Sequence, residues 1–140
     1  MRTFTVNVNV EWKRGAYNTY NATAAVDAFI PGIRGDESVG RARGWGYDKE
    51  SAAVCYAVSD NPLMQTFAMW SEFNPNTEKY GPQPVRKTDY GYDYCFDGAG
   101  VEVFRDLMRG NGFDVRESHG NSFDSYTFTR QVPESFVAMI

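Results

Sequence analysis

Residues 3–12 read Thr-Phe-Thr-Val-Asn-Val-Asn-Val-Glu-Trp, and this stretch decides the fold. Apolar side chains occupy every even position from Phe4 to Trp12, and polar side chains occupy every odd position from Thr3 to Glu11. Because successive side chains of a strand point to opposite faces, this period of two predicts a strand with one buried and one solvent-facing side. The sheet that contains it is therefore expected to be covered on one face only.

Two more strands are predicted directly after this one. Residues 19–29 alternate as well, with Tyr20, Ala22, Ala24 and Val26 on one face, and a turn over 13–18 makes the pair a hairpin. Pro31-Gly32 ends the second strand. A third strand is predicted over 38–45, and one of its faces is nearly bare, which lets a helix or another backbone approach closely. The residues of this bare face are Gly40, Ala42 and Gly44.

Helices are predicted in the middle of the chain. Asp48 is a plausible N-cap for a helix through Val58, and Asn61-Pro62 begins a second helix because proline suits the first helical position. The buried stripe of the second helix is Leu63, Phe67 and Trp70. Residues 74–87 lack periodicity and are expected to be a loop.

The remaining elements follow from the same signals. Residues 88–96 alternate and predict one strand, and Asp97 is expected to cap a third helix that ends at Arg109 and is closed by Gly110 or Gly112. The inward residues of that helix are Val101, Phe104, Leu107 and Met108. Residues 113–117 and 122–130 predict a closing hairpin with a turn at 119–121, and the apolar tail 132–140 is expected to dock on the domain.

Together these elements predict a single α+β domain over 1–140, with 132–140 as its tail. The order of the elements is βββ-αα-β-α-ββ. It indicates an antiparallel or mixed sheet of about five to six strands with three helices packed on one face.

Composition and charge narrow the function classes. The net charge is −4; residues 1–70 hold seven basic and seven acidic side chains, and residues 71–140 hold seven basic and eleven acidic ones. A general nucleic-acid binder is more often basic, so we expect a protein or a small ligand as partner. The two cysteines do not make a disulfide framework, and no leader-type or membrane-spanning apolar run is visible, so we expect a cytoplasmic protein.

The stretch 40–51 is the most suggestive for ligand binding. A glycine-rich turn over 40–46 that opens a helix could hold a phosphate on its backbone N–H groups. The stretch nevertheless fits neither the Walker spacing nor the dinucleotide fingerprint, and Asp48 and Glu50 lie where the phosphate would come. A close-packing turn from strand to helix is the alternative interpretation.

Arg41, Arg43, Trp45 and Tyr47 are the predicted partner-binding residues. Cationic and aromatic side chains that alternate on one strand face form a patch for stacking and salt contacts, and these residue types are enriched in interface hot spots. The alternative is that Trp45 belongs to the core and that the arginines are solvated.

His119 is the single histidine and the one candidate general base, with Asp124 or Asp114 as partners that could reach it across the hairpin. A turn histidine that is merely exposed is the alternative. Asp89, Asp93 and Asp97 are too far apart along a strand to share an ion, so neither a metal site nor a cofactor is expected. Cys55 and Cys95 are expected to be small buried residues. We therefore expect no catalytic residues and no enzyme.

Two resemblances suggest what such a protein does. Gly44 to Val54, together with Gly98-Ala-Gly, Phe113, His119-Gly120 and Phe123-Asp124, resemble small proteins carried by phages and mobile elements of bacteria. That resemblance implies a host-defence inhibitor of the anti-CRISPR group, which binds a host protein complex, with or without nucleic acid, in the host cytoplasm.

Val103 to Phe128 also resembles the helix and hairpin of HicA-like toxin ribonucleases, in which a Gly-Ser-His motif follows; here the order is Ser118-His119-Gly120, and the basic surround is missing. The leading hypothesis is therefore a non-catalytic inhibitor. The alternatives are a protein that binds a nucleotide or small ligand through 40–46, and a HicA-like RNA-binding protein or ribonuclease.

Overall fold

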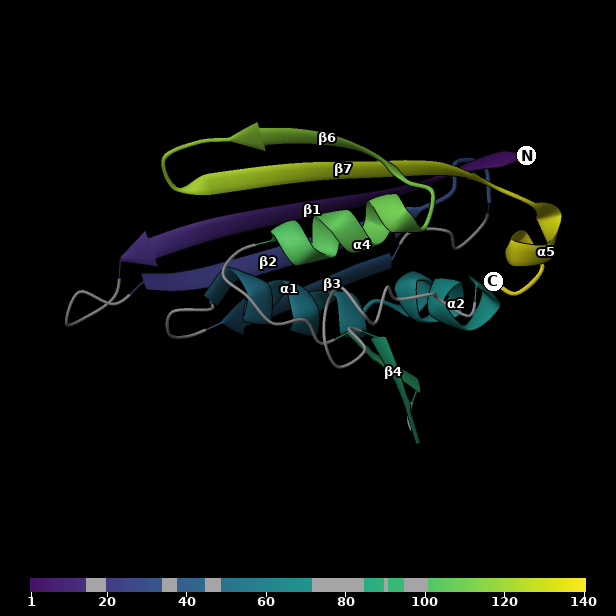
Figure 1. The fold of residues 1–140 in the computed structure, drawn as a ribbon, viewed down its shortest axis with the longest axis horizontal. Helices are drawn as coiled ribbons and strands as arrows, with labels where there is room; N and C mark the ends of the chain where they lie inside the picture. The colour runs from purple at the N-terminus through teal and green to yellow at the C-terminus, as the bar shows by residue number, and fades with distance from the viewer. Residues whose placement is uncertain (15–19, 34–37, 45–48, 72–84, 90, 95–100) are drawn as a thin grey trace.

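The computed structural model describes residues 1–14, 20–33, 38–44, 49–71, 85–89, 91–94 and 101–140. A five-stranded antiparallel sheet in the order β3-β2-β1-β7-β6 forms one layer, and helices lie over one of its faces (Figure 1). The strands of this sheet are β1 (Arg2–Arg14), β2 (Tyr20–Phe29), β3 (Ser38–Gly44), β6 (Asp114–His119) and β7 (Phe123–Val132). The predicted α+β class is confirmed, and the sheet is antiparallel and not mixed.

The described helices are α1 (Lys49–Ser59), α2 (Pro62–Ser71), α4 (Glu102–Gly110) and α5 (Glu134–Val137). The prediction of three helices is therefore one too few, because the apolar tail forms α5 and buries Phe136. None of the helices in these ranges has the length and the apolar character that crossing a membrane requires.

The stretch that decided the fold lies at the centre of the sheet. β1 pairs with β2 on one side and with β7 on the other, with Val8 opposite both Val26 and Tyr126. Its even-numbered residues Phe4 to Val10 are fully buried, whereas none of its odd-numbered residues is buried. The predicted alternation and the predicted hairpin with β2 are both confirmed.

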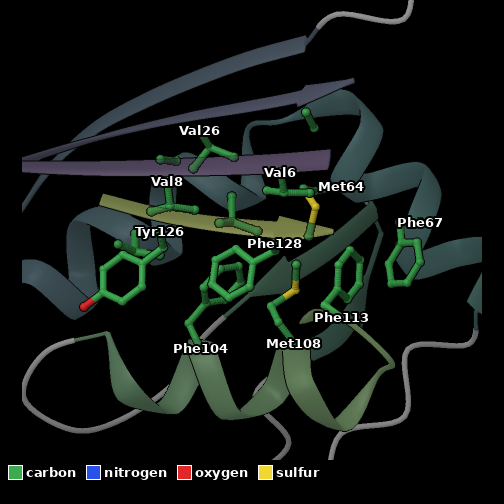
Figure 2. Close-up of a cluster of buried hydrophobic side chains, with 14 of the residues drawn as sticks. Val6, Val8, Val26, Met64, Phe67, Phe104, Met108, Phe113, Tyr126 and Phe128 are labelled. Atoms are coloured by element: carbon green, nitrogen blue, oxygen red, sulfur yellow. The ribbon is translucent and has the colours of Figure 1, made fainter. Parts of the chain in front are cut away.

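The core lies between this face and the helices. Figure 2 shows Phe104 and Met108 of α4 pointing toward Val8, Tyr126 and Phe128 of the sheet. At one end of the core, the aromatic rings of Phe4, Phe67, Trp70, Phe113 and Phe136 pack together, with centroid distances of 5.2–5.9 Å.

Helix α1 packs against the small residues of β3. Gly40 and Ala42 lie opposite the buried Val26 and Ala24 in the register, so these small residues share the covered face, and α1 packs on β3 and β2. The close approach predicted from the absence of side-chain bulk is confirmed.

Three predicted boundaries are wrong. Residues 85–87, expected in a loop, belong to strand β4 (Val85–Thr88), which pairs with β5 (Gly91–Tyr94) in a separate two-stranded sheet. The strand expected over 88–96 is therefore the second half of a hairpin. The helix expected to begin at Asp97 begins at Glu102, with Val101 at the N-cap position and without a side-chain cap; Asp97 itself lies outside the described residues, as does Asp48.

The end of α4 confirms the glycine prediction. The N–H of Gly112 donates to the carbonyl of Arg109 at 3.1 Å, and the N–H of Phe113 donates to that of Met108, also at 3.1 Å. Gly112 has a φ of 86°. These two bonds and the left-handed glycine make a Schellman cap, which turns the chain into β6.

Candidate functional site

One face of the five-stranded sheet is left without a helix over it in the described part of the chain. No residue that points to this side from β1, β2 or β7 is buried, and we call it the uncovered face. Its described members on the three central strands are Thr3, Thr5, Asn7, Asn9, Glu11 and Lys13 on β1, Thr23, Ala25, Asp27 and Phe29 on β2, and Phe123, Ser125, Thr127, Thr129 and Gln131 on β7.

The middle of the uncovered face is polar and largely uncharged. Neighbouring strands are joined there by side-chain hydrogen bonds: Ser125 donates to Oδ1 of Asn9 at 3.0 Å, and Nε2 of Gln131 donates to the Thr3 hydroxyl at 2.9 Å. Cross-strand pairs of this kind stabilise a sheet while leaving its surface able to form further hydrogen bonds. The polar side chains of this face are thus held by their cross-strand neighbours and can still bond to a partner.

Arg41 and Arg43 occupy the edge of the uncovered face. In the register of β3 with β2, Arg41 lies opposite Ala25 and Arg43 lies opposite Thr23, and both partners belong to that face. These two predicted partner-binding residues thus occupy register positions on the same face of the sheet. Trp45 and Tyr47, the other two, lie outside the described residues.

The glycine-rich segment is a strand over most of its length. Residues 40–44 belong to β3 and pair with β2, as the predicted strand over 38–45 requires, so they form a strand and not a turn. The anion site suggested for 40–46 stays a prediction. Residues 45 and 46 lie outside the described part.

A second group of functional side chains lies at the end of β6, on the covered side. His119 is directly opposite Asp124 in the β6–β7 register, and its Nδ1 is 2.7 Å from Oδ1 of that carboxylate. Its Nε2 is 3.5 Å from Oε1 of Glu117. The ring packs edge-on against Tyr126, with the centroids 5.6 Å apart. Of the two predicted partners, the structure brings Asp124 to the histidine, whereas Asp114 pairs with Thr129 at the other end of β6.

Glu117 connects this histidine to α4. Nη1 of Arg105 donates to Oε1 of Glu117 at 3.1 Å, and Nη2 of Arg109 lies 3.9 Å from Oε2. Nε of Arg105 is also 3.5 Å from a carboxylate oxygen of Asp106. We call His119, Asp124, Glu117 and Arg105 the His119 cluster; it joins β6, β7 and α4.

The electrostatics of the cluster favour the protonated imidazole. The pKa of His119 is raised above the usual histidine value, chiefly by its hydrogen bond to Asp124 and further by the nearby Glu117, against a smaller opposing effect of desolvation. The histidine side chain is 54% exposed, whereas that of Asp124 is 9% exposed. Protons therefore reach the ring easily, while the carboxylate that attracts them is fixed.

The geometry limits what the cluster can do as a catalyst. A histidine held through Nδ1 by a carboxylate is the usual arrangement of a general base, with Nε2 as the reacting atom. Here Nε2 faces Glu117 at 3.5 Å, and Glu117 is already bonded to Arg105. With Nε2 directed at Glu117, the side chains form a charge network in this conformation.

Comparison of the chain with protein-family models, with curated proteins and with solved structures gave no match. Function is therefore argued from the two sites themselves.

No set of three His, Cys, Asp or Glu side chains within the described ranges is arranged to hold a metal ion. Cys55 lies on α1 and packs against the core, but it is half-buried and not buried as predicted; Cys95 lies outside the described ranges.

Sequence reasoning did not find Glu117 and Arg105. The turn predicted at 119–121 leaves both Asp124 and Asp114 as partners of His119, and the register of β6 with β7 selects Asp124. The contact of Arg105 with Glu117 depends on how α4 lies over the hairpin, and the spacing along the chain carries no signal for that.

Proposed function

We propose that this chain is a non-catalytic binding protein, and that its uncovered face docks on a host protein complex that it inhibits. The observation that carries the proposal is an ordered face of a five-stranded sheet without buried residues on its three central strands, with Arg41 and Arg43 in register along one edge. Arginine is one of the residue types that are enriched in interface hot spots, so its presence along this edge supports a binding role.

Charge supports an acidic partner surface. The uncovered face carries four basic positions against three acidic ones, a net of +1, whereas the whole chain has a net charge of −4. These basic positions are Lys13, Arg41, Arg43 and Arg116, and the acidic ones are Glu11, Asp27 and Asp114. The other described residues hold eight basic against nine acidic side chains, a net of −1, so this face is slightly the more basic part of what the structure describes. That balance favours a negatively charged partner.

The resemblance to small proteins of phages and mobile elements supports a host defence complex of the CRISPR type as that partner. Such complexes carry nucleic acid, and inhibition requires only that a folded domain occupies a functional surface. On this proposal the protein acts in the cytoplasm of the infected cell and needs no cofactor.

The direct test is phage plating on cells with active CRISPR interference, with and without this protein, followed by binding of the purified protein to the corresponding effector complex. We expect plating to be restored for at least one type of CRISPR system and a complex to form in solution. Failure to bind any effector complex and failure to restore plating with each type of system would contradict the proposal.

Charge reversal locates the surface. Arg41→Glu combined with Arg43→Glu is expected to weaken binding by about 30-fold or more, which corresponds to ~2 kcal/mol. Arg2→Glu is the matched control, because Arg2 lies off the uncovered face in an exposed ion pair with Glu134. A folded double variant that binds as tightly as the wild type would remove this edge from the interface. Trp45→Ala extends the test to the next predicted residue.

Ribonuclease activity is the second candidate, because one observation favours it: the 2.7 Å contact of His119 with Asp124. RNA cleavage by the purified protein that is lost in His119→Ala would support it. Cleavage that is unchanged in this variant would assign the activity to a contaminant.

A further inference from the structure

Both ring nitrogens of His119 face a carboxylate. Nδ1 is 2.7 Å from Asp124, and Nε2 is 3.5 Å from Glu117. An imidazole donates from both nitrogens only when it is protonated, because the neutral ring has one donor and one acceptor. The geometry of the cluster is therefore that of the imidazolium form, which bridges β7 and β6.

Loss of the proton would act on one of the two contacts. Asp124 is nearly buried and lies directly opposite His119 in the ladder, so it keeps the remaining ring N–H. The lone pair of Nε2 would then face the Glu117 carboxylate, and the attraction would become a repulsion. Glu117 would keep only its arginine partners on α4.

The charged and titratable groups around the ring come from each element packed against it. They are Asp124 and Tyr126 on β7, Glu117 on β6, and Arg105, Asp106 and Arg109 of α4 behind Glu117. Among them only the histidine has an unperturbed pKa near neutrality. A change of pH between about 5 and 8 therefore acts on the cluster through His119.

The strand that would respond also forms the outer edge of the uncovered face. β6 is the last strand of the sheet and pairs with β7 alone. Its exposed residues Arg116 and Ser118 lie opposite Thr127 and Ser125, which belong to the uncovered face. Beyond His119, the N–H of Trp12 on β1 donates to the carbonyl of Ser122 in the hairpin turn at 2.9 Å.

We propose that the His119 cluster is a proton-controlled latch on β6, which holds Arg116 and Ser118 in place on the uncovered face when His119 is protonated and releases the end of β6 when it is not. This inference rests on the proposed binding function, whose affinity it makes higher at mildly acidic pH than at alkaline pH. The latch itself is a property of the free protein and is tested without a partner.

The experiment is NMR on the free protein between pH 5 and pH 9. His119 is the single histidine of the chain, so its ring signals are unambiguous. Within 117–119, Ser118 is the residue whose N–H points toward β7, because Gly120 donates to the carbonyl of Phe123 and hydrogen-bonded pairs alternate along an antiparallel ladder. We expect the amide of Ser118 to lose protection from hydrogen exchange as the ring titrates, after correction for the intrinsic rate. The protection factor should fall about tenfold for each unit by which the pKa of His119 in the closed strand exceeds its pKa in the opened strand.

Two variants keep the test independent of folding. In Glu117→Gln the carboxylate facing Nε2 is neutral, so the pKa of His119 should fall and the change in protection with pH should shrink, while the contact with Asp124 stays. In His119→Gln the protection of the Ser118 amide should not vary across the same pH range.

Protection of the Ser118 amide that stays constant through the titration of His119 in the wild-type protein would overturn the latch, whether or not the protein binds a host complex. The proposed control of partner binding by pH would be overturned if the protection from exchange varies with pH but the protein binds its partner with the same affinity at pH 6 and pH 8.5. Absence of any partner would count against the proposed function and leave the NMR result as the test of the latch.

Discussion

Nδ2 of Asn61 donates to the backbone carbonyl of Val26 across 3.2 Å, which fastens the start of α2 to the sheet. The same side chain accepts the N–H of Met64 on its Oδ1 at 3.1 Å, as an N-cap does. Asn61 is fully buried, so neither contact can be replaced by water without a rearrangement. One amide thus fixes both the beginning of a helix and its position on β2.

Replacement of Asn61 by alanine is therefore expected to lower the free energy of unfolding by ~2–4 kcal/mol, the sum of a lost cap and a lost buried hydrogen bond to the carbonyl of Val26. Urea unfolding followed by circular dichroism measures this. Asn61→Ser is the matched control, because a serine retains the cap and loses only the bond to Val26; its cost should be about half as large. Equal costs for the two variants would show that the cap contributes nothing.

The stability of the protein should depend on pH through His119. Its pKa is higher in the folded protein than in the unfolded chain, so the stabilisation is fully present below the unfolded pKa and is lost as the pH rises through the folded pKa. We expect the wild type to exceed His119→Gln in stability most at pH 5.5 and least at pH 8.5. Thermal unfolding of both proteins across this range measures the difference.

A difference between wild type and His119→Gln that grows with pH would contradict the sign of this linkage. Asp124→Asn serves as the control for its cause. Since the bond to Asp124 is the largest contribution to the raised pKa, that variant should bring the titration of His119 down toward its usual range.

Phe67 holds the aromatic end of the core together. Its ring lies 5.3–5.8 Å from the rings of Phe4, Trp70, Phe113 and Phe136, and it is fully buried. Phe67→Ala is expected to cost ~3–5 kcal/mol, because the cavity would open among four rings that cannot all move to fill it. Phe67→Leu should cost clearly less. Denaturant unfolding of the two variants checks both values.

The sequence predicted the sheet better than the order of elements around it. The alternation in residues 3–12 and the small residues of 40–44 indicate burial directly, and those strands lie where they were expected. The alternation over 88–96 predicts one strand. Its second half begins at Gly91, whose φ of 136° is a conformation that other residues rarely adopt, and it pairs back on Val85–Thr88.

The start of α4 shows a different reason for failure. Asp97 has the side chain of a good N-cap, yet the cap position is Val101, whose apolar side chain is buried in the core. Tertiary packing overrides capping preference here. The candidate site shows the same contrast between local and tertiary signals. Asp124 is one of the two partners that the sequence predicts for His119, because both lie in the same hairpin. Glu117 and Arg105 meet through the packing of α4 on the hairpin, which the sequence does not indicate.

Two glycines of one helix end should respond to alanine in opposite directions. Gly112 has a φ of 86°, and an alanine there would be strained although its Cβ would meet Arg130 only at 3.6 Å. Gly110 is the last residue of α4, and a Cβ there would meet no atom within 4 Å. We expect Gly112→Ala to destabilise the protein by about 1 kcal/mol and Gly110→Ala to stabilise it by ~0.5–1 kcal/mol, because alanine favours the helix and restricts the unfolded chain. Unfolding in urea under identical conditions decides the signs. The same sign for both variants would show that the cap of α4 differs from the one described, and with it the angle at which the chain enters β6.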